Sequence, residues 1–215
     1  RRYFPHLRKE RLHTIPNGID VSGYGTPQEP WLREELKLDA GTPLVGFLGR
    51  FMPEKGFPLL LDAVERLKGG RFHVVAFGSR DYRREYQKRI DQAGLSRRVT
   101  LRDFVPDVRA VLPQLGLVLV PSLWEASSLV SMEAMSAGVP VLGSDCPGLR
   151  EVLRGTPSRT FAAGDAEACA EALRSSLDSL WTDEALRFAP LARERFDNRR
   201  SAARLVQLYT REARR

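Results

Sequence analysis

The chain has 215 residues and carries 34 Lys and Arg against 27 Asp and Glu, which gives a formal net charge of +7. A domain of this size buries roughly 70% of the surface that its unfolded chain exposes, so a disordered chain, a disulfide-dependent mini-protein and a collagen-like fibre are excluded. No apolar run approaches the ~20 residues of a membrane-spanning helix, and no signal-peptide pattern opens the sequence. We therefore expect a soluble, cytoplasmic protein. Because the sequence starts at Arg1 instead of Met, we expect a piece of a longer polypeptide.

The cysteines and histidines match no metal-binding pattern. Cys146 and Cys169 lie far apart without CxxC spacing, and the three histidines, His6, His13 and His73, are scattered along the chain. Zinc sites need such ligands at short, regular spacings. The sequence therefore predicts reduced thiols and no bound metal.

Basic residues are spread along the whole sequence instead of forming one block. Most fall on polar faces of predicted helices, where solvated charge is the plain interpretation. Attraction to a phosphorylated ligand or to an anionic membrane surface is the second interpretation, and the latter would make the protein peripheral to the inner face of the membrane. No interleaved aromatic residues accompany the charge, so we expect no nucleic-acid partner.

Short apolar runs alternate with longer helical patterns from about residue 43 onward. Runs typical of buried strands occupy residues 43–49, 72–77, 99–101, 117–120 and 139–142. Helical patterns fall between them, at residues 59–67, 82–93, 108–115 and 129–137. This alternation predicts an α/β fold, a Rossmann-like open parallel sheet with helices on both faces.

Further helices follow the predicted sheet. Residues 165–180 open with Asp165 as an acidic N-cap, and two more helices start near Asp183 and Arg199. We expect three parts in the chain: a lead-in segment from a preceding domain, one Rossmann-like domain, and C-terminal helices that pack on this domain or on the preceding one. Their expected bounds are residues 1–14, 15–182 and 183–215.

Two cations stand in the loop after the first predicted strand. In an open parallel sheet, ligands bind beyond the carboxyl ends of the strands, and this loop places Arg50 and Lys55 between Gly49 and Gly56. The planar guanidinium can hold a phosphate with two hydrogen bonds, and the lysine adds a mobile point charge. An ordinary charged surface loop is the alternative interpretation.

The loop after the predicted strand at residues 117–120 leads into a helix. Ser127 or Ser128 is the expected N-cap, and the amides of Ser128, Leu129 and Val130 would then form an anion site at the positive end of the helix dipole.

Two carboxylates flank that helix start. Glu125 precedes the helix and Glu133 lies about a turn and a half into it, so we expect them on either side of a bound diphosphate, with Arg50 and Lys55 keeping both ionised. Solvated glutamates are the alternative interpretation. A third loop at residues 143–151 adds small residues and Asp145, or is a plain strand-to-helix connection.

Taken together, these segments resemble the C-terminal domain of the GT-B retaining glycosyltransferases of family four. The resemblance covers about residues 13–180, and its most specific element is Glu125 followed, after seven residues, by Glu133. The motifs occur in the family's order: IPNGID at residues 15–20, GRFMPEKG at 49–56, PSLWEASSLVSMEAMSAGVPVLGSD at 121–145, GLRE at 148–151 and AGD at 163–165.

The resemblance implies a role for each matching position. Arg50 and Lys55 would neutralise the diphosphate of a nucleotide-sugar donor, and Gly49 would let the backbone approach it. Glu133 would bind the ribose and Glu125 would lie near the hexose hydroxyls. The amides of Ser128, Leu129 and Val130 would contact the sugar or the phosphate. Phe104, Val105 and Pro106 would line the base pocket, with residues 78–80 beside it. Asn17 and Gly18 would lie near the cleft between the family's two domains.

The resemblance also sets expectations for the whole enzyme. It implies transfer of a hexose from a nucleoside-diphosphate sugar, with UDP favoured and with retention of configuration. No metal is expected, because cations and helix-start amides stabilise the leaving diphosphate, and no cofactor is expected, because the nucleotide sugar is a substrate. The acceptor site belongs to an N-terminal domain that this sequence lacks, so we expect donor binding and little or no transfer from this chain alone.

One departure leaves an alternative open. Where the family commonly has Gly-Phe-Gly after the first glutamate, this chain has Ala126, Ser127 and Ser128, which puts the donor sugar in question. A nucleotide-binding regulatory or inactive relative is therefore the second hypothesis. A dehydrogenase would need a GxGxxG turn, and the segment Phe77–Arg80 lacks the required glycines.

Overall fold

The computed structural model describes residues 12–26, 29–67, 69–79 and 82–213. The predicted position of Arg80 and most of the predicted lead-in segment at residues 1–14 lie outside these residues. The fold is a six-stranded, fully parallel sheet in the order β3-β2-β1-β4-β5-β6. The predicted Rossmann-like fold is therefore confirmed. Its strands are β1 (Leu44–Leu48), β2 (His73–Gly78), β3 (Val99–Asp103), β4 (Leu117–Val120), β5 (Val141–Ser144) and β6 (Arg159–Phe161).

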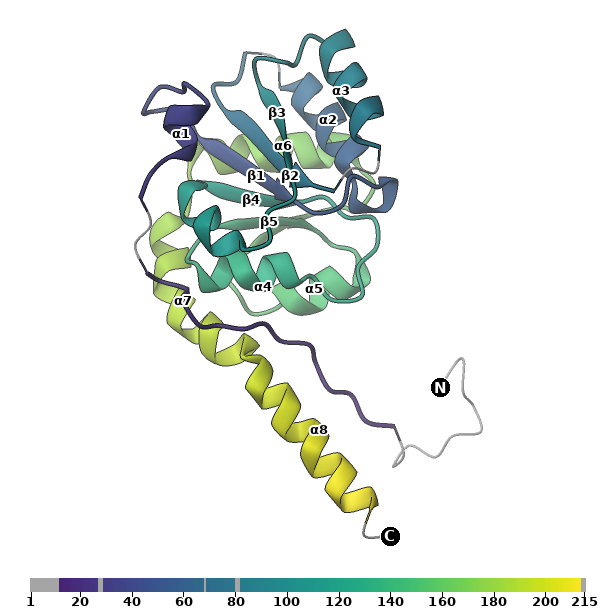
Figure 1. Ribbon diagram of the computed structural model, residues 1–215. Helices are drawn as coiled ribbons and strands as arrows, with labels where there is room; N and C mark the ends of the chain where they lie inside the picture. Colours follow the sequence, from purple (N-terminus) through teal and green to yellow (C-terminus); the bar gives the residue numbers. More distant parts are fainter. Residues whose placement is uncertain (1–11, 27–28, 68, 80–81, 214–215) are drawn as a thin grey trace.

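Helices cover both faces of the sheet, and each face has its own apolar core (Figure 1). The strands are nearly continuous apolar runs because both of their faces are buried. One layer holds α2 (Phe57–Arg66), α3 (Arg83–Gln92) and α6 (Ala166–Asp178), and the other holds α4 (Leu129–Ser136), α5 (Pro147–Leu153) and α7 (Thr182–Phe196), with the short α1 (Leu32–Glu35) beside it.

The strand order reverses at the centre of the sheet. From β1 the chain moves outward through β2 to β3, and it then returns to place β4 on the other side of β1, with Val45 opposite Leu117. The loops that follow β1 and β4 therefore diverge to opposite faces at neighbouring strand ends. Such a switch point leaves a crevice at the carboxyl edge of the sheet.

Two local predictions are corrected by the structure, and it adds one strand that the sequence does not predict. Residues 108–115 form two 3-10 turns instead of one helix, because Pro113 lacks an amide proton and disfavours helical backbone before it. β5 starts two residues later than predicted, after Pro140, which cannot donate to a ladder. The edge strand β6 has three residues and no apolar run to signal it.

The segment around Ile19 packs against the junction between α7 and α8 (Asn198–Glu212). Ile19 donates its amide to the carbonyl of Phe196 at 2.8 Å, and Asn198 donates its amide to the carbonyl of Ile19 at 3.0 Å. Gly18 lies so close to this junction that a Cβ there would come within 2.6 Å of the Phe196 carbonyl oxygen. Beyond it, α8 extends away from the sheet domain (Figure 1) and contains no buried residue. Among the described residues, no helix is long and apolar enough to cross a membrane.

Candidate functional site

Two neighbouring cavities open at the crevice between β1 and β4. Their volumes are about 290 and 280 Å³. Both are lined by Leu48 and Gly49 at the end of β1, by Lys55, and by Val130 at the start of α4. We call the one that reaches Glu133 the first cavity and the one that reaches Glu125 the second cavity. The two expected carboxylates thus lie in separate but adjoining spaces.

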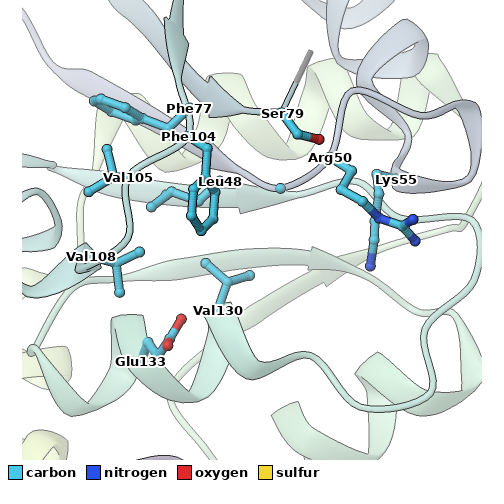
Figure 2. Close-up of a pocket in the computed structure, with 11 residues that line it drawn as sticks. Leu48, Arg50, Lys55, Phe77, Ser79, Phe104, Val105, Val108, Val130 and Glu133 are labelled. Atoms are coloured by element: carbon cyan, nitrogen blue, oxygen red, sulfur yellow. The ribbon is translucent and has the colours of Figure 1, made fainter. Parts of the chain in front are cut away.

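The first cavity is apolar along its length and charged at its ends (Figure 2). Figure 2 shows Arg50 and Lys55 together at one end and Glu133 at the other, with the Phe104 ring between them. Phe104 is 66% exposed, so its ring is free to pack against a flat ligand. This arrangement suits a ligand with an aromatic ring and an anionic group.

Burial dominates the electrostatics of Glu133. Its pKa is raised, first by burial and second by the charge of Asp107, while Arg109 opposes the shift. Arg109, and not the Arg50 or Lys55 considered from the sequence, is the cation that lowers the pKa of this carboxylate here. Burial and the Glu133 charge likewise raise the pKa of the Tyr24 phenol.

The side chain of Arg109 connects its own loop to residues 20–22 beside Glu133. Its guanidinium donates to the Asp107 carboxylate at 2.7 Å and to the carbonyl of Ser22 at 2.8 Å, and it lies 3.9 Å from the Asp20 carboxylate. No local sequence pattern singles out Arg109 or Tyr24, because their closeness to Glu133 depends on how residues 20–24 cross the domain.

A sharp turn brings the loop after β1 onto the loop after β4. Pro53–Lys55 form a 3-10 turn that ends at Gly56 with φ +73°. A Cβ at Gly56 would lie 1.8 Å from the Pro121 carbonyl oxygen, so only glycine fits this approach. The amide of Leu123 donates to the carbonyl of Glu54 at 2.8 Å. These contacts place Lys55 against Glu125.

Glu125 is held by two hydrogen bonds in the second cavity. Its Oε1 accepts from Lys55 Nζ at 2.9 Å and from Ser122 Oγ at 2.9 Å, and its side chain is 9% exposed. Gly148 at the start of α5 packs under this loop, since a Cβ there would come within 2.1 Å of the Glu125 carbonyl oxygen. A fixed carboxylate beside a cation can accept hydrogen bonds from the hydroxyls of a polar ligand.

The start of α4 lines the second cavity as predicted, although its cap differs in detail. Ser128 is the N-cap, but its side chain does not bond to the helix amides. Its hydroxyl shares a 2.8 Å hydrogen bond with that of Ser131, and both side chains are buried. The Ser128 hydroxyl is thus paired with Ser131, and Ser127 is the half-buried hydroxyl residue on the wall of the second cavity.

The structure brings most of the predicted site residues together. Gly49, Arg50, Lys55, Phe104, Val105, Val130 and Glu133 line the first cavity, and Gly49, Lys55, Glu125, Ser127, Ser128, Leu129 and Val130 line the second. Pro106 is exposed and lines neither cavity. Asn17 lies in a separate 420 Å³ cavity that shares Ser127 with the second. Asp145 accepts from the amide of Ala163 at 2.8 Å and lines neither cavity of the site.

Several lining residues were not selected from the sequence. Leu48 and Phe77, which the sequence places in buried strands, and Val108, which it places in a helix, line the first cavity. Ser122 could have been noticed as a polar residue directly after a buried strand. Among the described residues, no three His, Cys, Asp or Glu side chains form a group that could hold a metal ion.

Comparisons with known proteins converge on one family. The family model described as glycosyl transferases group 1 matches residues 42–179. Alpha-maltose-1-phosphate synthase of Mycolicibacterium smegmatis is 30% identical over 198 residues, which cover 85% of this chain and 50% of that protein. The chain therefore spans about half the length of this curated relative.

Two solved structures share the fold. Anabaena HepE in complex with UDP and glucose superposes with a TM-score of 0.84 at 25% identity, over 94% of this chain and 58% of that one. The C-terminal domain of a glycosyl transferase group 1 protein, LpcC, from Francisella tularensis superposes with a TM-score of 0.64 at 18% identity, over 82% of this chain and 95% of that one.

Proposed function

The chain belongs to the glycosyl transferases group 1 family, and we propose that it is the donor-binding half of a GT-B enzyme that transfers a hexose from a nucleoside-diphosphate sugar. The observation that carries this proposal is the pair of cavities that share Lys55 at the β1–β4 switch point. The apolar first cavity would hold the nucleoside, with Glu133 on the ribose. The second would hold the hexose beside Glu125. UDP is the proposed nucleotide, supported by the UDP in the HepE structure.

The placement of the cations suits the departure of a nucleoside diphosphate. Negative charge grows on the phosphates as the glycosidic bond breaks, and groups fixed there in advance stabilise the transition state more than the ground state. Arg50, Lys55 and the amides at the start of α4 would supply this stabilisation. We propose that these groups serve in place of a divalent metal, and that the leaving phosphate assists front-face attack with retention of configuration.

The acceptor site is proposed to lie in a preceding N-terminal domain. Helix α8, whose Val206 and Tyr209 are 61% and 65% exposed, would face that domain. On this proposal the chain binds donor by itself and transfers little or no sugar.

A nucleotide-binding regulatory or inactive relative is the second candidate function. Ser128 favours it, because it stands where the family commonly has a glycine and lines the second cavity, where a glycine lets a sugar pack closely. Replacement of Glu133 or Lys55 by Ala in the full-length parent separates the two. Loss of transfer supports the enzyme, and unchanged transfer contradicts the roles given to these residues.

We also propose a cytoplasmic location with peripheral attraction to anionic membranes, based on the net charge of +7. Binding to vesicles that contain anionic lipid should disappear at high salt. Binding that is insensitive to salt, or no binding at low salt, would contradict this attraction.

A thermal-shift series with UDP, GDP and ADP, each with and without Mg²⁺, tests the donor site. A ligand at a hundred times its dissociation constant adds about 2.7 kcal/mol, or roughly 5 to 10 °C in melting temperature for a domain of this size. The proposal predicts such a shift with UDP, independent of Mg²⁺. A shift with another nucleotide would correct the base, and no shift with any would contradict the donor site.

A further inference from the structure

Two buried serine hydroxyls connect strand β5 to Glu125 through hydrogen bonds. Ser144 at the end of β5 donates its hydroxyl to the carbonyl of Ser122 at 2.5 Å, and Ser122 donates its own hydroxyl to Glu125 Oε1 at 2.9 Å. Ser122 is 1% exposed and Ser144 is fully buried. These two hydrogen bonds connect the interior of the sheet to a carboxylate on the wall of the second cavity.

The hydrogen bonds that reach Glu125 from the described residues both end on Oε1. A carboxylate has two oxygens that accept hydrogen bonds, so Oε2 is the oxygen presented to a ligand. The orientation of the carboxylate, and with it the position of Oε2, is set by the two donors on Oε1.

The two donors differ in how a ligand would affect them. Lys55 lines both cavities and is 25% exposed, so an anionic ligand draws its ammonium away from Glu125. Ser122 is buried and neutral, so the charge of a diphosphate does not draw its hydroxyl away from Glu125 as it draws an ammonium. The Ser122 hydrogen bond is therefore the one that persists when a diphosphate is bound.

We infer that Ser122 is a positioning residue for the hexose of the donor, holding Glu125 in place while Lys55 engages the diphosphate. This inference rests on the proposed function, in which Glu125 faces the hexose. It predicts an effect on the sugar part of the donor and none on the nucleotide part. A merely structural serine would affect both or neither.

Calorimetric titration of the chain with a nucleoside diphosphate and with its glucosyl donor tests the inference. UDP and UDP-glucose are used first, and GDP or ADP with the matching glucosyl donor if one of those nucleotides binds instead. In Ser122→Ala, the affinity for the glucosyl donor should fall roughly 3- to 10-fold, while the affinity for the free nucleotide stays within about twofold. Ser122→Thr, which keeps a hydroxyl, should recover most of the loss.

Ser136→Ala is the matched control. Ser136 is also fully buried, and its hydroxyl has no hydrogen-bond partner among the described residues, so its removal should change neither affinity. Ser144→Ala should also lower the affinity for the glucosyl donor more than the affinity for the nucleotide. It replaces Ser122→Ala as the test if Ser122→Ala does not fold. Equal losses for nucleotide and donor, or no loss, would contradict the role of Ser122 and leave the donor site standing. No binding of any nucleotide or glucosyl donor by the unmodified chain would contradict the proposed function itself.

Discussion

The ammonium of Lys55 and the carboxylate of Glu125, 70 positions apart in the sequence, form an ion pair with a 2.9 Å separation. Lys55 belongs to the loop after β1 and Glu125 to the loop after β4, so the pair joins the two strands at which the sheet reverses its order. Lys55 lines both cavities, whereas Glu125 lines only the second. The ion pair thus lies where the proposed nucleotide and sugar spaces adjoin.

Replacing Lys55 by Met should weaken nucleotide binding about 10- to 100-fold, because a hydrogen bond between charged groups contributes about 1.5–3 kcal/mol. Methionine keeps an apolar stem in the loop and removes only the charge. The measurement is calorimetric titration with UDP at one fixed salt concentration.

Arg66→Met is its control, since it also removes one positive charge but lies in a surface pair with Glu167, away from both cavities. Equal losses in the two variants would show that overall charge, and not the Lys55 contact, governs affinity.

Gly56→Ala should lower the free energy of unfolding by about 2 to 4 kcal/mol, because the new methyl group would meet the Pro121 carbonyl and because Gly56 has φ +73°. Urea unfolding measures this loss. Gly94→Ala is the matched comparison, since Gly94 has φ +68° and a Cβ added there would meet no atom within 4 Å; conformational strain alone should cost it about 1 kcal/mol. Similar losses of unfolding free energy at both positions would mean that the close contact between Gly56 and the Pro121 carbonyl adds nothing to the cost.

Glu133→Gln should stabilise the fold at neutral pH and weaken nucleotide binding. Burial raises the pKa of Glu133, so the ionised side chain is disfavoured in the folded state, and its contribution to stability is lost as pH rises through the folded pKa. The gain from Gln should therefore be present at pH 7 and absent below about pH 4.

Urea unfolding at the two pH values and titration with UDP test both effects, and about tenfold weaker binding is expected from the lost hydrogen bond to the ribose. The exposed Glu85→Gln change should alter neither. A Glu133→Gln variant that binds UDP as well as the unmodified chain would remove Glu133 from the site.

His73 should make the fold less stable in mild acid. It is buried at the start of β2, its Nε2 lies 2.9 Å from Thr100 Oγ1, and burial lowers its pKa. The unfolded chain then binds more protons than the folded chain, so the free energy of unfolding falls as pH drops below about 6.5. Comparing urea unfolding of the unmodified chain and of His73→Gln from pH 5 to 8 isolates this dependence. If the free energy of unfolding changed with pH equally in both proteins, the pH dependence would come from groups other than His73.

Much of the fold and most of the site could be predicted because their signals are local. Buried parallel strands are apolar runs, and Asp165 caps α6 by accepting from the amide of Ala168 at 2.9 Å as its position suggested. The motif segments that contain Lys55, Glu125 and Glu133 come directly after such apolar strands in the sequence. Their positions at neighbouring strand ends follow from the strand order.

The rest depends on contacts between distant segments. The environment of Glu133 depends on Tyr24 and Arg109, which reach it from elsewhere in the chain. The hydroxyl of Ser128 is bonded to Ser131 instead of to a helix amide, and only three-dimensional packing decides this. Pro106 directly follows the two cavity-lining residues Phe104 and Val105 in sequence, yet it is exposed and lines neither cavity.

Amide chemical shifts of the ¹⁵N-labelled chain during titration with UDP test most directly whether the nucleotide binds at this crevice. Binding there predicts that the amides of Gly49, Val105 and Val130 shift together in a saturable way. The amides of Phe188 and Leu191, in the separate cavity between α7 and α8, should stay unchanged. Saturable shifts confined to that other cavity, or no shift at Gly49 and Val130, would contradict binding at the crevice.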